Sequence, residues 1–277
     1  IKYFMDSFNK VAHLTSAHHR FDTRIFHKMS MSLVKHSYDV YLIVADGGGD
    51  EVLSNIEILD VGKPTNRFRR MLFSPFQIFL KAKYINADIY HLHDPELLFV
   101  GFLLLMDGKR VIFDSHEDYS KQTLIKHYLS NKIRTLLSKA VLLVEQFTFP
   151  HFSGVIAATP AIKEKFSELR ISSVNINNYP LLEEQKKIIS SSICTQTDIC
   201  YVGTISQTRG LHELCSALDI LGEEVSLNLC GYFSDLKFYE TLKELPSWNI
   251  VNYMGYLDRN DLLTVYDRSI CGIVTLH

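Results

Sequence analysis

The stretch ADIYHLHDPELLFVGFLLLMDGKRVIFDSHEDY, residues 87–119, decides the fold of this chain. It contains two short runs of β-forming residues, 89–93 and 110–115, joined by an apolar segment of helical length. A strand, a helix and a second strand in this order predict a βαβ unit with parallel strands.

Each of the two runs ends in a polar cluster, HLHD at residues 91–94 and DSHED at residues 114–118. If the strands are parallel and adjacent, both clusters emerge at the same carboxyl edge of the sheet. Open α/β sheets bind their ligands at that edge. The sequence therefore predicts a site there that contains histidines and carboxylates.

A structural interpretation accounts for part of this pattern. Asp94 suits the N-cap of a helix, with Pro95 at its first position and Glu96 in its first turn. His91 and His93 point to one face of their strand because side chains alternate along it. A buried structural role for His91 fits as well as a functional one.

Length, charge and cysteine usage limit the class of protein. The 277 residues suffice for two domains, and a net charge of −2 argues against nucleic acid as a partner. Five scattered cysteines predict a reduced, cytoplasmic protein. The longest apolar run, residues 97–106, is too short to span a bilayer.

Strand and helix patterns alternate through residues 1–178, stop in the polar, serine-rich segment 179–196, and resume through residues 197–277. We therefore expect an α/β protein with two Rossmann-like domains and a linker between them. The predicted strands are residues 10–15, 38–45, 56–61, 89–93, 110–115, 154–158, 174–177, 199–202, 226–230, 250–253 and 271–275. The predicted helices include residues 24–35, capped by Asp22 or Thr23, and residues 121–149, 210–221, 233–245 and 258–267.

A second motif, GTISQTRG at residues 203–210, lies between a predicted strand and a predicted helix. Its glycines allow close approach of the backbone to a ligand, and a helix amino terminus attracts anions. Arg209 adds a planar cation suited to phosphate oxygens. The motif lacks the spacing of the known phosphate loops, so a plain tight turn remains open beside diphosphate binding.

The two motifs predict different roles for the two domains. The acidic cluster of the first domain would repel a nucleotide diphosphate, whereas the loop with Arg209 would attract it. Arg209 and a helix terminus can stabilise a phosphate leaving group without a metal ion. Carboxylates near the sugar can stabilise an oxocarbenium-like transition state.

Four segments carry a resemblance to a known family: FDTRIFHK at 21–28, ADIYHLHDPEL at 87–97, FDSHEDY at 113–119 and YVGTISQTRGL at 201–211. In this order they resemble family 4-type glycosyltransferases with the GT-B fold, particularly those of bacterial surface-polysaccharide synthesis. The resemblance implies a cytoplasmic, retaining, metal-independent hexosyltransferase without a cofactor. It would move a sugar from a nucleotide-diphosphate sugar, UDP- or GDP-linked, to a glycan or lipid-linked acceptor.

The resemblance also implies roles for particular residues. His116 matches a histidine beside the transferred sugar, Arg209 falls where the family commonly has a phosphate-binding lysine, and residues 255–257 fall in the loop against the base. The candidate residues are His116, Glu117 and Asp94 for catalysis, Gly203, Thr204, Arg209, Gly210, Gly255, Tyr256 and Leu257 for the donor, and Arg24, His93 and Glu96 for the acceptor side.

The sequence departs from the family pattern in two places. Thr204 stands where the family frequently has an arginine, which weakens the expected phosphate clamp. The family's acidic E-x7-E motif would lie beyond His277, and the chain opens on Ile1 rather than Met. We therefore expect a chain cut at both ends, with an incomplete second domain, and its activity on its own stays open.

Three alternatives remain. A metal-dependent hydrolase could use His91, His93, Asp94 and His116 as ligands. A degenerate transferase could bind a sugar or a partner without turnover. Residues 63–76 combine basic with aromatic and aliphatic residues, which fits either a solvated basic helix face or a peripheral contact with an anionic membrane at the inner leaflet.

Overall fold

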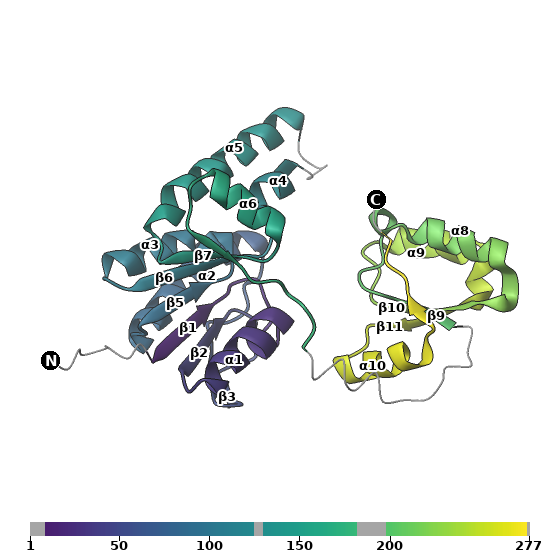
Figure 1. The fold of residues 1–277 in the computed structure, drawn as a ribbon, viewed down its shortest axis with the longest axis horizontal. Helices are drawn as coiled ribbons and strands as arrows, with labels where there is room; N and C mark the ends of the chain where they lie inside the picture. Colours follow the sequence, from purple (N-terminus) through teal and green to yellow (C-terminus); the bar gives the residue numbers. More distant parts are fainter. Residues whose placement is uncertain (1–8, 125–129, 182–197, 276–277) are drawn as a thin grey trace. The chain divides into compact units, whose positions relative to one another are not determined.

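The computed structural model describes residues 9–124, 130–181 and 198–275. The chain divides into two compact units, Ile1–Tyr179 and Pro180–His277, which are coloured purple to green and green to yellow in Figure 1. Most of the predicted linker, residues 182–196, lies outside the described residues.

Unit 1 is built on an eight-stranded sheet in the order β3-β4-β2-β1-β5-β6-β7-β8. Its strands are β1 (Lys10–Leu14), β2 (Asp39–Val44), β3 (Glu51–Leu53), β4 (Ile56–Asp60), β5 (Ile89–Leu92), β6 (Arg110–Ser115), β7 (Gly154–Ala157) and β8 (Ser173–Asn175). Its helices are the π-helix η1 (Thr23–Ser30), α1 (Met31–Lys35), α2 (Arg67–Ile85), the 3-10 turn η2 (Pro95–Leu97), α3 (Leu98–Met106), α4 (Tyr119–Leu124), α5 (Asn131–Thr148), the 3-10 turn η3 (Phe149–His151) and α6 (Pro160–Glu168).

The predicted βαβ unit is confirmed, because β5 and β6 are adjacent and parallel. The chain leaves β1 for β2 on one side of the sheet and returns to β5 on the other side of β1. This reversal of strand order is the point where open α/β sheets bind ligands.

Both faces of the sheet in unit 1 are covered. One face packs residues such as Leu14, Tyr90 and Phe113 into the main core, and helices α2 and α3 contribute residues to the same core. Alternation along the strands places the other face under η1, where Ile25 and Phe26 pack on β2 and β4.

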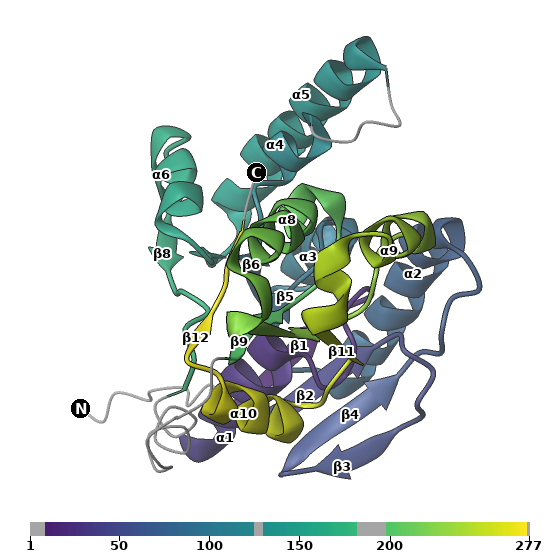
Figure 2. The ribbon, with the colours of Figure 1, turned by 90° about the vertical axis from the view of Figure 1, so that its right-hand side faces the viewer.

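Several elements of unit 1 differ from the prediction. The helix expected at 24–35 begins as a π-helix, with the Asp22 carboxylate accepting the first amides. Residues expected to form one helix at 121–149 contribute to two, α4 and α5. The antiparallel strand β3 was not predicted, and it lies beside β4 (Figure 2). Ser54 and Asn55 in the turn between these strands both have positive φ.

Unit 2 contains a parallel sheet in the order β11-β10-β9-β12. Its strands are β9 (Asp198–Val202), β10 (Ser226–Cys230), β11 (Val251–Gly255) and β12 (Cys271–Gly272). Its helices are the 3-10 turn η4 (Gln207–Arg209), α8 (Leu211–Leu221), the 3-10 turn η5 (Gly222–Glu224), α9 (Leu236–Lys243), the 3-10 turn η6 (Pro246–Ile250) and α10 (Arg259–Arg268). Two predicted elements are shorter than expected: α9 starts only after Asp235 has capped it, and β12 covers two residues.

None of the helices within the described residues is both long and apolar enough to cross a bilayer.

Candidate functional site

A row of polar side chains crosses three adjacent strands of unit 1. His13 of β1 is the register partner of His91 of β5, and His91 is in turn the partner of Ile112 on β6. Asp114 follows Ile112 by two residues and so points to the same face as the two histidines. All three polar residues are buried, on the face of the sheet opposite the main core.

The Asp114 carboxylate is the centre of this cluster. Arg24, from η1, donates to both of its oxygens, over 2.7 Å from Nε and 2.8 Å from Nη2. His116 Nε2 lies 3.1 Å and His93 Nδ1 3.5 Å from the Oδ2 oxygen. Burial alone would raise the pKa of Asp114, but these donors outweigh it and hold the pKa far below its usual value.

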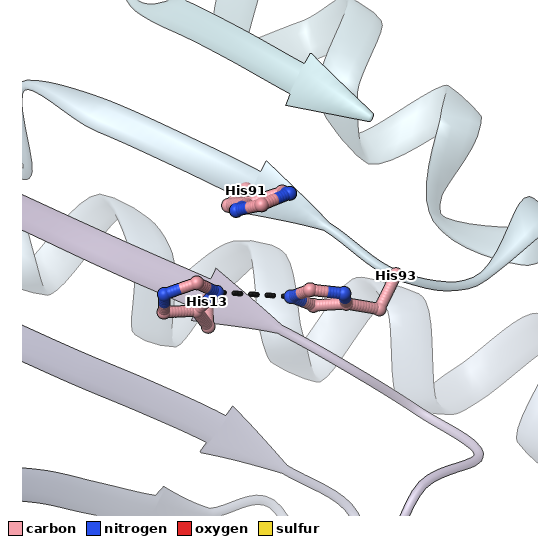
Figure 3. A group of neighbouring side chains, drawn as sticks. All are labelled: His13, His91 and His93. Carbon is pink, nitrogen blue, oxygen red and sulfur yellow. Dashed lines mark hydrogen bonds between the residues drawn. The ribbon is translucent and has the colours of Figure 1, made fainter. Parts of the chain in front are cut away.

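Figure 3 shows a group of three imidazoles, those of His13, His91 and His93, of which His93 also contacts the Asp114 carboxylate. His13 Nδ1 and His93 Nε2 are 2.9 Å apart, and the His91 ring lies 4.9 Å from the His13 ring and 4.5 Å from the His93 ring between centroids. Burial lowers the pKa of His91 to about 3 and of His93 to about 4, and it also lowers the pKa of His13. These rings are therefore neutral at physiological pH.

Asp94 forms a second centre at the end of β5. Its carboxylate accepts from the Thr15 hydroxyl over 2.7 Å and from the backbone amides of Ser16 and Ala17 over 2.6 and 3.1 Å. Although Asp94 occupies the N-cap position of η2, its side chain makes no capping bond there. The predicted helix start is confirmed in position, with Pro95 and Glu96 in the first turn, but the Asp94 carboxylate does not cap it because its donors come from the loop after β1.

Asp94 also contacts His18, whose Nδ1 lies 3.1 Å from the Oδ1 oxygen. Burial would lower the pKa of His18, but Asp94 outweighs this and the pKa is raised. The His18 ring in turn faces the ring of His116, with 5.0 Å between centroids. The loops after β1, β5 and β6 therefore meet at one edge of the sheet.

Three residues predicted for catalysis or for the acceptor side contact other parts of the protein. Glu117 is exposed and accepts from the side-chain amide of Gln122. Glu96 lies 3.0 Å from Arg70 of α2, without hydrogen-bond geometry. Arg24, assigned to the acceptor side, is buried and both of its donating nitrogens face Asp114.

Two groups of side chains in the described residues bring metal-binding atoms within 4.8 Å of one another, His13 with His91 and His93, and His93 with Asp114 and His116. Neither group contains Asp94. The ligand set considered for a hydrolase is therefore not assembled as predicted.

In unit 2, the carboxyl ends of β9, β10 and β11 surround a pocket of about 220 Å³. Its lining consists of Val202, Gly203, Thr204, Cys230, Gly231, Tyr232, Tyr256, Leu257 and Leu262. Four predicted donor residues therefore line one cavity. Gly255, Arg209 and Gly210 do not line it; Arg209 is exposed in the turn before α8, and Gly210 is the N-cap residue of that helix, with a φ of 66°.

The lining of this pocket requires a glycine, Gly231, that was not among the predicted donor residues. Gly231 has a φ of 144°, and a Cβ atom there would lie 1.8 Å from the carbonyl oxygen of Gly203. Any side chain at position 231 would therefore collide with the backbone of the predicted donor loop. The signal was present in the sequence as a glycine directly after a strand.

The sequence matches the family model described as Glycosyltransferase Family 4 over residues 23–177, more than half of the chain. This chain belongs to Glycosyltransferase Family 4. Comparison of the sequence with curated proteins gives no match.

Solved structures with a similar fold include sucrose-phosphate synthase from Thermosynechococcus elongatus, with a TM-score of 0.70 at 14% identity over 96% of this chain and 75% of that one. The structure of Anabaena HepE in complex with UDP and glucose has a TM-score of 0.65 at 13% identity, over 96% of this chain and 74% of that one. The catalytic domain of starch synthase IV from Arabidopsis thaliana, bound to ADP and acarbose, has a TM-score of 0.65 at 12% identity, over 97% of this chain and 78% of that one. The predicted fold class, two Rossmann-like units of GT-B type, is confirmed.

In this family 4 chain the structure adds three residues to the candidates predicted from the sequence. His13 and His18 join the site because β1 lies beside β5, a pairing that no local pattern reveals. Asp114 had a detectable signal, since it precedes His116 by two residues at the end of the same strand.

Proposed function

We propose that this family 4 chain transfers a sugar, with retention of configuration, from a nucleotide-diphosphate sugar to a glycan or lipid-linked acceptor. The observation that carries the proposal is the pocket at the glycine-containing ends of β9, β10 and β11. Related folds bind nucleotides, as the complexes of HepE with UDP and glucose and of starch synthase IV with ADP illustrate.

The charges in unit 2 support a diphosphate beside this pocket. Arg209 and the amino terminus of α8 belong to the same β9–α8 connection as the pocket residues Gly203 and Thr204, and both favour negative charge. In this proposal they balance the leaving diphosphate, so that no metal ion is required. The donor would be UDP- or GDP-linked, and a hexose is the expected sugar.

The edge of unit 1 would then serve the sugar and the acceptor. His116 is partly exposed and would contact the transferred sugar, with Glu117 beside it. Asp94 is buried among donors and would act through His18 rather than by direct contact. His93, Arg24 and Glu96 would support the acceptor side from within the fold.

Arg209→Ala is expected to weaken binding of UDP or GDP by about 1.5 to 3 kcal/mol, the scale of a hydrogen bond to a charged group. Isothermal calorimetry with each nucleotide measures this. Lys237→Ala, which removes an exposed cation of the same unit on α9, is the matched control and should change little. Equal affinities in the wild type and Arg209→Ala would remove Arg209 from the donor site.

Helix α2 supports peripheral contact with an anionic membrane at its cytoplasmic face. Exposed apolar side chains on this helix are Met71, Leu72, Phe73, Phe76, Leu80 and Tyr84. Arg69 is exposed beside them, whereas Arg70 faces Glu96. The side chains of residues 67 and 68, which the prediction also used, lie outside the described residues.

Co-sedimentation with vesicles tests this contact. Binding is expected to vesicles containing anionic lipid, and to fall at least about tenfold in Leu72→Glu/Phe76→Glu, since each apolar side chain buried in lipid contributes ~1 to 3 kcal/mol. Ile220→Glu, on the exposed face of α8, is the control. Equal binding to zwitterionic vesicles, or an unchanged double variant, would contradict the proposal.

A metal-dependent hydrolase is the second candidate, because the two histidine groups of unit 1 place potential ligand atoms close together. Elemental analysis of protein purified without chelator separates the two: stoichiometric zinc or manganese favours the hydrolase. Binding without turnover of any nucleotide sugar would instead indicate a non-catalytic, degenerate transferase.

A further inference from the structure

The hydrogen bonds around Asp114 have a fixed direction. Asp114 is a buried carboxylate whose Oδ2 oxygen receives Arg24 Nε over 2.7 Å and lies 3.1 Å from His116 Nε2. A ring nitrogen at that distance from a carboxylate oxygen must carry a hydrogen, because two lone pairs would repel each other. A neutral His116 is therefore protonated at Nε2 and bare at Nδ1.

The same reasoning extends inward along the imidazoles. His93 Nδ1 lies 3.5 Å from the Asp114 Oδ2 oxygen and 3.4 Å from His116 Nε2, which is also within hydrogen-bonding distance. Because an ionised carboxylate is a stronger acceptor than an imidazole nitrogen, both ring nitrogens direct their hydrogens to Asp114 rather than to each other, which leaves His93 Nε2 as an acceptor. His13 Nδ1 then donates to His93 Nε2 over 2.9 Å. His13 Nε2, which is buried and has no hydrogen-bond partner among the described residues, becomes an acceptor.

The opposite direction is less favourable. If His93 Nε2 donated to His13, then His93 Nδ1 could accept from His116 Nε2, but its lone pair would also lie 3.5 Å from the carboxylate, and His13 Nε2 would carry a buried hydrogen without an acceptor among the described residues. Orphaned buried N–H groups are rarer in folded proteins than under-satisfied acceptors. All donors in the row therefore point toward Asp114, and Arg24 holds this carboxylate in place with two bonds.

We infer that Asp114, fixed by Arg24, is a positioning residue that holds His116 as the Nε2–H tautomer, so that His116 Nδ1 accepts a hydrogen bond from a hydroxyl of the bound sugar. The part that concerns the sugar rests on the proposed function. The tautomer itself follows from the contacts of unit 1 alone. The other groups that face His116 are His93 and His18, and His18 is in turn bound to Asp94.

The test replaces the whole ion pair, in Arg24→Met/Asp114→Leu, because apolar residues of similar size can substitute for a buried pair without unfolding the protein. In this variant the nearest partner left to His116 Nε2 is His93 Nδ1, at 3.4 Å, which can donate or accept. Both tautomers of His116 should then be populated. The matched control is Arg20→Met/Asp46→Leu, which removes a similarly buried two-bond pair elsewhere in unit 1.

Long-range proton–nitrogen correlation spectra of histidine-labelled protein report the tautomer, and the signals lost in His116→Gln assign that ring. The wild type and the control should show one protonated nitrogen, Nε2, and one bare nitrogen, Nδ1. In Arg24→Met/Asp114→Leu the two nitrogen shifts should converge toward an average. Protonation at Nδ1 in the wild type, or an unchanged pattern in this variant, overturns the inference.

Turnover of a nucleotide sugar tests the second part of the inference, the hydrogen bond between His116 and the sugar. Arg24→Met/Asp114→Leu should lose about tenfold in kcat, the equivalent of one hydrogen bond, with little change in the KM for the donor. A loss confined to KM, or an equal loss in the control, overturns the positioning role. If the wild type shows the expected tautomer but turns over no nucleotide sugar, the proposed function fails and the assignment of the tautomer stands.

Discussion

Asp114→Ala is expected to lower the free energy of unfolding of unit 1 by about 3 to 5 kcal/mol, because it strands the Arg24 guanidinium without a counter-charge. The pair is desolvated, with Asp114 fully buried and Arg24 nearly so. Asp114→Ala also removes the acceptor of His93 and His116. The cost of a buried, unpaired charge exceeds the net contribution of the intact pair.

Urea unfolding with hydrogen exchange at the β5 and β6 amides measures this loss, since exchange reports unit 1 separately from unit 2. Asp46→Ala is the control: Arg20 loses one partner there but keeps Glu51. The control variant should therefore lose clearly less free energy of unfolding than Asp114→Ala. Replacing both members of the pair, in Arg24→Met/Asp114→Leu, should cost less than about 2 kcal/mol, and a larger loss in this double variant than in Asp114→Ala would contradict the account.

As the pH falls, unit 1 is expected to lose stability at pH values above those at which carboxylates titrate. The rings of His13, His91 and His93 have lowered pKa values in the folded state, at about 3 for His91 and about 4 for His93. Unfolded histidine takes up a proton near pH 6.5, so the unfolded state binds more protons below that pH. Their contribution to stability is thus present above pH 6.5 and is lost as the pH falls toward 4.

The free energy of unfolding should drop by about 2 to 5 kcal/mol between pH 6.5 and 4.5. His18 opposes this change, because Asp94 raises its pKa and so stabilises the folded state at low pH. Asp94 and Asp114 have lowered pKa values and lose their contributions only below about pH 4.

Unfolding curves across this pH range, for the wild type and His91→Leu, measure the effect. His91→Leu should flatten the slope by up to about 1.4 kcal/mol per pH unit, the value of one proton. His151→Leu, at an exposed position, serves as the control. A slope that His91→Leu leaves unchanged would show that the buried imidazoles do not cause the acid sensitivity.

Local periodicity was sufficient for much of the fold. The run of apolar residues between 89–93 and 110–115 predicted parallel strands, and β5 and β6 have that arrangement. Breaks inside long helical patterns were harder to predict: within the pattern at 121–149, Ser130 has an extended backbone and precedes a new helix, α5. The short strand β3 was missed because it is exposed and carries no buried alternation.

The candidate site was only partly predictable for a related reason. The polar ends of β5 and β6 could be identified from the sequence. In the structure His18 contacts both Asp94 and the ring of His116, so the two predicted residues belong to one cluster. The sequence suggested a cap for Asp94, whereas the structure gives it the amides of the loop after β1. That preference depends on donors almost eighty residues away in the chain.

The sequence by itself determined the α/β class, the resemblance to glycosyltransferases and the position of polar clusters at strand ends, since these depend on the period of side chains and on residues close in the chain. Only the tertiary structure decided that His13 lies against His93 and that Arg24 is bound to Asp114, ninety residues away. It likewise decided that Gly231 must be a glycine, because the Gly203 carbonyl occupies the space of a side chain. These contacts follow from strand order and from backbone approach, which the pattern within a single strand or helix does not encode.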